Sequence, residues 1–250
     1  MRRFFIKQSE TAGPISVITG TDARHIKKVL RLKPRDIITL FDGAGSEYEA
    51  RIISLSADSV NVSIMRSFSS TTEPPIQIIV AQAFLKQRKM DKLVRQLTEL
   101  GITKWVPFIS RRSVPRPDNK RLAVRANRWK KISREALKQC NRSRIMEIGP
   151  TVSFEDTFNI SKQSSLKIVF WENESKPVNL ALAQSNRHFN NIFIMIGPEG
   201  GFTSQEIEKA KACGFITAAL GPRILRAETA TIAASVLIQY LFGDIGIKNS

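Results

Sequence analysis

Hydrophobic and polar positions follow two different patterns along the chain. Up to about residue 67, short runs of β-branched residues alternate with polar ones, and turns at Asp42-Gly43 and at 57–59 separate these runs. This alternation predicts antiparallel hairpins of a small β-barrel. The stretch 22–32 has apolar residues at helical spacing and predicts one short helix among the strands.

The second pattern begins after 67–75, SFSSTTEPP, where serine, threonine and proline interrupt either periodicity. Beyond it, apolar runs typical of buried parallel strands alternate with stretches of helical spacing. Strands are expected at 76–84, 104–110, 165–172, 191–197 and 216–220, and helices at 89–101, around 129–140, at 202–214 and at 228–242. The alternation predicts an α/β domain with a mainly parallel sheet. We therefore expect two domains, 1–70 and 74–245.

Individual residues support two of these helices. Met90, Leu93 and Leu97 share one face of the helix at 89–101 and are expected in the core. Thr203 and Glu206 have the spacing of a capping box at the start of the helix at 202–214.

The net charge of the chain and its distribution indicate a kind of binding partner. The chain has 39 Lys and Arg against 22 Asp and Glu, a formal charge of +17. The charge is concentrated between Arg111 and Arg144, where thirteen basic residues face two acidic ones. A short basic run is usually a solvated helix face, but a stripe with most of the net charge favours contact with a polyanion such as RNA.

Several classes of protein are not indicated. The apolar run near the start, at 4–6, is too short for a signal-peptide core, and no stretch approaches the ~18 apolar residues of a membrane span. Cys140 and Cys213, like His25 and His188, stand apart in sequence, so neither a disulfide framework nor a metal site is predicted. We expect a cytoplasmic protein with no metal and no membrane partner.

Two loops share one design. GPEGG at 197–201 and GPRILRAET at 221–229 each follow a predicted strand and lead into a helix. In open α/β sheets, ligands bind at the carboxyl ends of the strands. Glycine allows positive φ and close approach of the backbone, so such loops suit a flat heterocycle such as adenine. Either loop alone is more often a tight turn; the pair favours a binding site.

The ligand of these loops is not expected to be a polyphosphate. Neither GxGxxG nor GxxxxGK[ST] is present, and Glu199 would repel phosphate. A ligand with adenosine and a positive centre fits better. S-adenosylmethionine has both, because it carries a sulfonium and an ammonium group.

The loop sequences IGPEGGFTSQE and LGPRILRAETA resemble the paired motifs of the SPOUT methyltransferases, and specifically of the bacterial 16S ribosomal RNA uridine-N3 methyltransferases. The similarity extends over the whole chain, through RRFF, HIKKVLRLKPRD, LKQRKMDKLVRQLTELGI, RRSV and WKKISREALKQCNR. One position departs: Ala227 stands where the family pattern RTETA has threonine. The departure affects at most one hydroxyl contact.

The resemblance implies a fold and an activity. It implies a PUA-like barrel at 1–70, a SPOUT domain with a carboxyl-terminal trefoil knot, and a homodimer with its active sites at the subunit interface. The implied reaction is S-adenosylmethionine-dependent methylation of N3 of a uridine in 16S ribosomal RNA of the small ribosomal subunit, by family uridine 1498 of the decoding region.

The family's cofactor contacts carry over to the two loops and to the end of one strand. They are Glu172, Ile196, Gly197, Pro198, Glu199, Gly200, Gly201, Leu220, Gly221, Ile224, Leu225, Arg226, Thr229 and Ala230. The role of Glu199 stays open between contacting the cofactor, capping a neighbouring amide and pairing with an arginine of the partner subunit.

The reaction requires that uridine N3 lose its proton. Arg226 is a candidate to hold a uracil oxygen and stabilise the developing negative charge. Glu228 is a candidate proton acceptor, although an acidic residue that complements the dipole of the last helix is an equally good interpretation.

The RNA contacts are expected from basic residues in both domains. The candidates are Arg2, Arg3, Arg31, Lys33, Lys86, Arg88, Lys89, Arg111, Arg112, Arg134, Lys138 and Arg142. Two other functions remain open at this point: methylation of a different ribosomal or transfer RNA nucleotide, and a non-catalytic role as an RNA-binding ribosome-assembly factor.

Overall fold

The computed structural model describes residues 2–10, 13, 15–86, 88–114, 116–178 and 189–246. His188 lies outside the described residues. The chain divides into two compact units, the first formed by 1–73 with 134–145 and the second by 74–133 with 146–250. The division falls inside one helix, so the segment 134–145 packs with the amino-terminal unit. The domain ranges 1–70 and 74–245 stay a prediction.

The first unit is a curved five-stranded sheet. Its order is β1 (Arg3–Phe5), β3 (Ile37–Phe41), β4 (Ser46–Leu55), β5 (Ser59–Ser69) and β2 (Ser16–Thr19). The β1–β3 pair is parallel and the other pairs are antiparallel. Two register shifts between β4 and β5 bend these long strands. Among the described residues no pairing of β1 with β2 closes the sheet, so the predicted barrel is a half-barrel.

Apolar residues pack together on one side of this sheet. Ile18, Leu40 and Val60 are buried there together with Ile26. Ile26 lies in the helical segment α1 (Gly20–Arg24), which continues as a π-helical turn at His25–Val29. The predicted short helix at 22–32 is therefore confirmed.

The second unit is built on a parallel sheet, as predicted. Its strand order is β12 (Ile216–Ala218), β10 (Leu166–Phe170), β11 (Asn191–Ile196), β6 (Gln77–Ala83), β7 (Lys104–Ile109) and β8 (Glu147–Ile148), and β9 (Val152–Ser153) also pairs with β7. Every pair among them is parallel. All five predicted strands are present. The short strands β8 and β9 were not expected.

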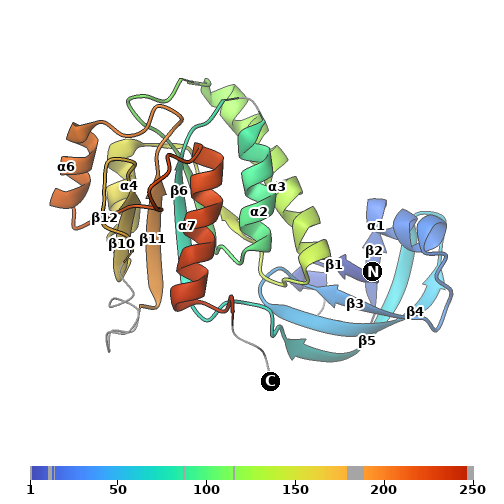
Figure 1. Ribbon diagram of the computed structural model, residues 1–250. Helices are drawn as coiled ribbons and strands as arrows, with labels where there is room; N and C mark the ends of the chain where they lie inside the picture. The colour runs from blue at the N-terminus through green and yellow to red at the C-terminus, as the bar shows by residue number, and fades with distance from the viewer. Residues whose placement is uncertain are drawn as a thin grey trace. The chain divides into compact units, whose positions relative to one another are not determined.

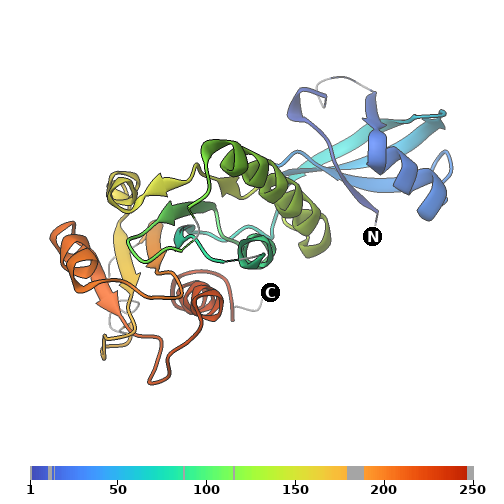
Figure 2. The ribbon, with the colours of Figure 1, turned by 90° about the horizontal axis from the view of Figure 1, so that it is seen from above.

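Helices cover both faces of this sheet (Figures 1 and 2). One face carries α2 (Lys89–Glu99), α3 (Asn119–Cys140) and α7 (Ala227–Phe242), and the other carries α4 (Phe154–Ser161) and α6 (Ser204–Ala212). Each face has its own core. Met90, Leu93 and Leu97 of α2 are buried in the first, as predicted, and Phe154 and Ile207 in the second.

The carboxyl ends of β10, β11 and β12 lie at one edge of the sheet. The loop after β12 runs beside the segment after β10, because the Ala219 amide donates to the Lys176 carbonyl at 2.8 Å and Pro177 bridges to Ala219. Three chain segments thus meet at this edge. The trefoil knot implied by the resemblance stays a prediction.

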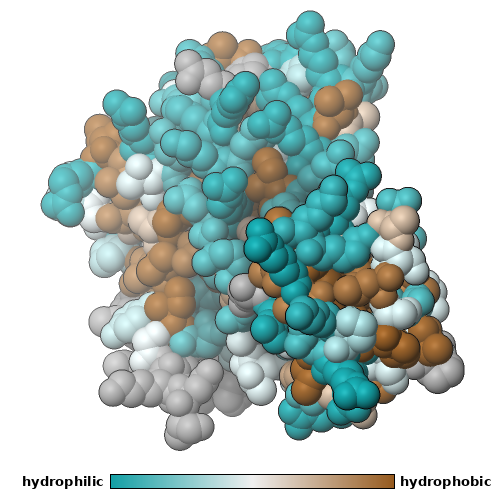
Figure 3. All heavy atoms as spheres, turned by 90° about the vertical axis from the view of Figure 1, so that its right-hand side faces the viewer, coloured by the Kyte–Doolittle hydropathy of each residue, from teal (hydrophilic) through white to brown (hydrophobic). Residues whose placement is uncertain are grey.

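Figure 3 shows one face of the molecule, where hydrophilic side chains dominate and hydrophobic ones form scattered patches. Within the described residues, no helix is long and apolar enough to cross a membrane. The same residues contain no group of three or more His, Cys, Asp or Glu side chains with metal-binding proximity.

Candidate cofactor and active site

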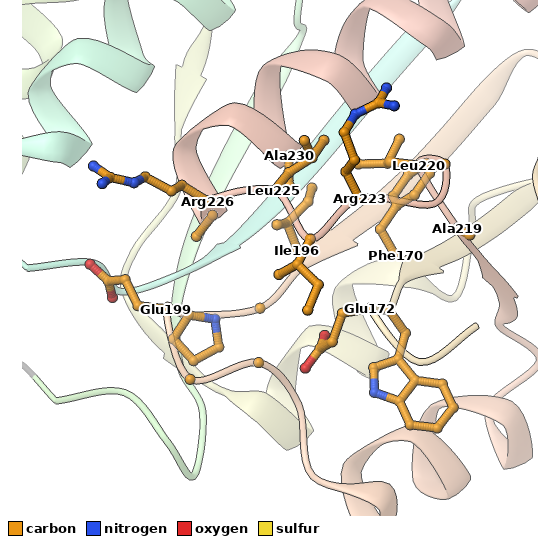
Figure 4. Close-up of a pocket in the computed structure, with 18 of the residues that line it drawn as sticks. Phe170, Glu172, Ile196, Glu199, Ala219, Leu220, Arg223, Leu225, Arg226 and Ala230 are labelled. Carbon is orange, nitrogen blue, oxygen red and sulfur yellow. The ribbon is translucent and has the colours of Figure 1, made fainter. Parts of the chain in front are cut away.

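A cavity of about 580 Å³ opens where the two glycine loops and the end of β10 meet. Figure 4 shows the apolar side chains of Ile196, Leu220, Leu225 and Ala230 around it, with the carboxylate of Glu172 below them. The second unit alone forms this cavity. Its position at the carboxyl edge of a parallel sheet is the one expected for a ligand site.

At one position of the loop after β11, only glycine fits the backbone conformation and the space available. Gly201 has φ of +66° and its amide donates to the Pro198 carbonyl at 3.0 Å. A Cβ atom at Gly201 would overlap the carboxylate of Glu172. The loop and the end of β10 therefore approach each other directly, through backbone on one side and a carboxylate on the other.

A buried glutamine ties this loop to the last helix. Gln82, at the end of β6, donates from Nε2 to the carbonyl of Gly197 at 3.3 Å and to its neighbour Ala83 at 3.0 Å. Its Oε1 accepts from the hydroxyl of Thr231 in α7. Gln82 and Thr231 are both 0% exposed. A polar link buried this deeply fixes one glycine loop against the helix that the other loop begins.

The helix that follows the first loop is capped as predicted. Thr203 and Glu206 form a complete capping box, and Glu206 also accepts from the Arg111 amide at 2.9 Å. Arg112 donates to the Gly200 carbonyl at 2.8 Å, and Arg111 donates to Gln205 at 2.7 Å. Of these two arginines, both predicted to contact RNA, Arg112 holds the loop and Arg111 holds the start of α6.

Glu199 is paired within its own chain. Its Oε1 accepts from the backbone amide of Lys86 and from Nζ of Lys89, each at 3.1 Å. Burial raises the pKa of Glu199, but these donors and its own backbone amide lower it more, so the pKa lies below its ordinary value. Glu199 therefore caps the Lys86 amide, and a lysine of its own chain compensates its charge. Contact with the cofactor or with an arginine of the partner subunit stays a prediction.

The same lysine reaches the start of α7. Nζ of Lys89 lies 3.1 Å from Oε2 of Glu228 as well as 3.1 Å from Glu199. Burial lowers the pKa of Lys89, yet its contacts with Glu199 and Glu228 raise it above the ordinary value. Lys89 therefore stays a cation between two carboxylates.

The loop after β12 supplies an arginine at a helix start. Arg226 is the residue before α7, with extended backbone, φ −61° and ψ 147°. Figure 4 shows Arg226 and Glu199 projecting from opposite loops toward the same side of the cavity. Ala227, where the family pattern has threonine, is buried and accepts from Thr231 through its carbonyl at 2.7 Å. The loop thus closes without the missing hydroxyl.

Most of the residues expected to contact the cofactor line this cavity. They are Glu172, Ile196, Gly197, Pro198, Glu199, Gly200, Gly201, Leu220, Gly221, Ile224, Leu225, Arg226 and Ala230. Thr229 is exposed and is not part of the lining.

Sequence reasoning missed some of the lining. Phe170, Trp171, Ala219, Pro222, Arg223, Ala227 and Lys89 also border the cavity. Phe170 and Trp171 had a usable signal, since Glu172 was placed at the same strand end. Lys89 had none, because its role depends on partners 110 and 139 positions away.

Two of the predicted RNA contacts need correction. Arg3 and Arg142 are 7% and 3% exposed, and both pair with carboxylates inside the first unit, Arg3 with Glu47 and Arg142 with Glu73. A buried, paired guanidinium is not placed to reach a phosphate. Lys138 is half-buried against Asp22 and Glu135.

The other candidates for RNA contact are accessible, apart from the half-buried Lys89. The exposed ones are Arg2, Arg31, Lys33, Lys86, Arg88, Arg111, Arg112 and Arg134.

Family models match both units of the chain. An RNA methyltransferase domain model matches residues 72–239, and an RNA methyltransferase PUA domain model matches residues 18–65. The ribosomal RNA small subunit methyltransferase E of Bacillus subtilis is 32% identical over 247 residues, covering 96% of each protein. That of Rickettsia conorii is 30% identical over 228 residues, covering 91% of this chain and 90% of that protein.

Solved structures extend the match to three dimensions. A ribosomal RNA small subunit methyltransferase E from Neisseria gonorrhoeae, bound to S-adenosyl methionine, superposes with a TM-score of 0.85 at 32% identity, covering 98% of this chain and 99% of that one. A putative methyltransferase from Legionella pneumophila with bound cofactor gives a TM-score of 0.86 at 29% identity, with the same coverage. The chain therefore belongs to the ribosomal RNA small subunit methyltransferase E family of SPOUT-class RNA methyltransferases.

Proposed function

We propose that this protein uses S-adenosylmethionine to methylate N3 of a uridine in 16S ribosomal RNA. The observation that carries the proposal is the cavity between the two glycine loops at the carboxyl edge of β10, β11 and β12. The relatives named for ribosomal RNA methylation support the substrate class. The cofactor-bound Neisseria and Legionella structures support the cofactor.

The residues around the cavity fit the cofactor. Its volume of about 580 Å³ lies within the usual range for ligand sites. Apolar side chains and glycine backbone suit an adenine ring, and the carboxylate of Glu172 suits a ligand with positive groups. The indole Nε1 of Trp171 is shielded from solvent and has no hydrogen-bond partner among the described residues.

When bound, the cofactor supplies an electrophilic methyl group. The chain's own residues must then orient the uridine and manage the N3 proton. We assign Arg226 to a uracil oxygen, where its guanidinium would stabilise the negative charge that develops on the ring. Glu228 is the candidate proton acceptor, because it follows Arg226 by two residues and is held by Lys89.

RNA binding is assigned to the exposed basic residues. In the part of α3 that belongs to the second unit, Lys120, Arg121, Lys130 and Lys131 are exposed and extend the predicted set. Phosphate contacts release counterions, so RNA affinity should fall steeply with salt. The uridine must leave its stack to expose N3, which lies on the pairing edge. An RNA substrate of this kind accords with a cytoplasmic protein.

The outer face of α7 supports a homodimer. After Glu228 this helix contains no charged residue. The half-buried Val236 and the 64% exposed Tyr240, four positions apart, share its outer side. Ile224 in the preceding loop is 85% exposed. An apolar helix face with these neighbours fits a second copy of the chain. Sedimentation of wild type and Tyr240→Glu checks this, with the variant expected to be monomeric.

The test of function combines binding with mapping. Purified protein is mixed with radiolabelled S-adenosylmethionine and small ribosomal subunits from a strain that lacks the modification. The expected result is label at one uridine of 16S ribosomal RNA, together with calorimetric binding of the cofactor alone. Label in transfer RNA or 23S ribosomal RNA would show that the protein methylates a different RNA. Binding of RNA without affinity for the cofactor would favour a role as an assembly factor.

The assignment of Arg226 is tested in the same assay. Arg226→Ala should lower the methyl-transfer rate roughly 100-fold while changing cofactor affinity much less. Arg223→Ala is the matched control, because Arg223 also borders the cavity but has no assigned role in the reaction. A rate retained in Arg226→Ala would refute the assignment.

A further inference from the structure

Lys89 occupies a position that electrostatics alone does not favour. It is the first residue of α2, and the amino terminus of a helix repels cations. The acidic residue of that first turn, Asp91, does not compensate it. Asp91 pairs instead with Arg128 at 2.9 Å and with the indole of Trp129 at 3.1 Å. The reason for a lysine at this point must lie outside α2.

Two carboxylates from other elements provide that reason. Glu199 comes from the loop after β11 and Glu228 from the first turn of α7, and Lys89 Nζ is 3.1 Å from each. The three side chains are 26% to 28% exposed. Oε2 of Glu228 is shielded from solvent, and Lys89 is the charged group that contacts it. Without Lys89, two carboxylates would face each other with no cation between them.

We propose that Lys89 is a positioning residue of the active site rather than an RNA phosphate contact. It fastens the 197–201 loop to the start of α7 and so holds both glycine loops in the geometry of the cavity. It also keeps Glu228 beside Arg226. This inference rests on the proposed function for its role in catalysis, but the fastening itself is a property of the fold.

The fastening is tested through cofactor affinity. Lys89→Met removes the charge and keeps most of the side-chain length, and it should weaken S-adenosylmethionine binding roughly 10-fold in calorimetry. Glu199→Gln should weaken it less, and Lys89→Met/Glu199→Gln should be no weaker than Lys89→Met alone, because the two residues act as one contact. Lys89→Arg should restore affinity. Effects that add in the double variant would overturn the proposal.

Methyl transfer gives a second readout that a purely structural lysine would not move. In Lys89→Met, Glu199 loses a cation that lowers its pKa, so the acid limb of the pH–rate profile should shift to higher pH. The groups that face Lys89 in this profile are Glu199 and Glu228, with Arg226 on the same side of the cavity. An unshifted limb in an otherwise slowed variant would count against the assignment.

RNA binding separates the two roles of Lys89. A phosphate contact would lower the salt slope of RNA affinity by about one when removed. Lys89→Met should show the same salt slope of RNA affinity as the control Lys92→Met. Lys92 is an exposed lysine of the same helix. A reduced salt slope with unchanged cofactor affinity would show that Lys89 contacts an RNA phosphate and would overturn the proposal. If the wild-type protein binds the cofactor but methylates no RNA, the proposed function fails. The cofactor affinities of the single and double variants still test whether Lys89 fastens the 197–201 loop to α7.

Discussion

At the scale of single residues, Glu199 has partners within its own chain that its sequence motif did not indicate. Its negative sign excluded a phosphate ligand, and S-adenosylmethionine, a ligand with positive groups, was inferred instead. In the structure the nearest cation is Lys89, and the carboxylate also caps the Lys86 amide. The sign of a residue limits which ligands a loop accepts, but the sequence does not show which neighbour neutralises it.

The lowered pKa of Glu199 predicts a pH dependence of stability. A carboxylate whose pKa is lower in the folded state stabilises the fold at pH values above its ordinary pKa of 4.5. That contribution is lost as pH falls through the lower folded-state pKa. Wild type should therefore be more stable than Glu199→Gln near neutral pH, and this advantage should shrink only below about pH 4.5. Urea unfolding between pH 7 and pH 3 measures it, and a constant difference would contradict the shift.

Gly201 offers a second test at this scale. Gly201→Ala meets both a positive φ and the carboxylate of Glu172, whereas Gly20, with φ of +67°, has open space around its Cβ position. Gly20→Ala should cost about 1 kcal/mol of stability from backbone strain alone. Gly201→Ala should cost more and should weaken cofactor binding. Adding Glu172→Ala should recover part of the loss. Equal costs at the two glycines would show that Glu172 can move away freely.

At the scale of secondary structure, long periodic segments were predictable and short ones were not. Four of the five strands expected from the sequence have at least five residues, and the four expected helices have at least nine, enough for a period to appear. The three-residue β12 is the exception. The strands β8 and β9 have two residues each, and α4 has eight. Pairing with β7 fixes β8 and β9, and Ser153 caps the start of α4. Tertiary contacts rather than local pattern define the two strands, whereas α4 has a local start signal in Ser153 and Asp156.

The junction of β6, the first glycine loop and α7 could not be predicted from either loop motif. Thr231→Val removes the hydroxyl that donates to Gln82 and leaves a buried amide oxygen unpaired. We expect a loss of about 1–3 kcal/mol in unfolding free energy and weaker cofactor binding. The matched control is Ser235→Ala, since Ser235 is equally buried but bonds only within α7, to the Thr231 carbonyl at 2.8 Å. Similar losses in both variants would show that Gln82 finds another partner.

At the scale of the whole molecule, the basic segment 111–144 serves more than one purpose. Ten of its thirteen basic side chains are exposed, which fits an RNA surface. Its last part belongs to the first unit, where Arg142 is buried and Lys138 is paired with Asp22 and Glu135. Charge counting locates such a stripe but does not separate phosphate contacts from internal ion pairs. Only burial makes that distinction.

The anchoring of 134–145 to the amino-terminal unit gives the last prediction. Glu73 accepts from the amides of Ser143 and Arg144, both at 2.8 Å, and from Nη2 of Arg142 at 2.9 Å. Glu73→Ala leaves these donors without that acceptor and a buried guanidinium without this carboxylate. The expected cost is about 3–5 kcal/mol.

Because residues 1–73 and 134–145 form one compact unit, that loss should appear as early unfolding of the first unit. Hydrogen exchange during urea unfolding would show β1, β3 and the segment 141–145 losing protection together, before the parallel sheet. Glu147→Ala, which removes an exposed partner of Lys104, should change stability by no more than about 0.5 kcal/mol. If Glu73→Ala loosened 141–145 while β1 and β3 kept their protection, the segment would be an attachment to the first unit rather than part of it.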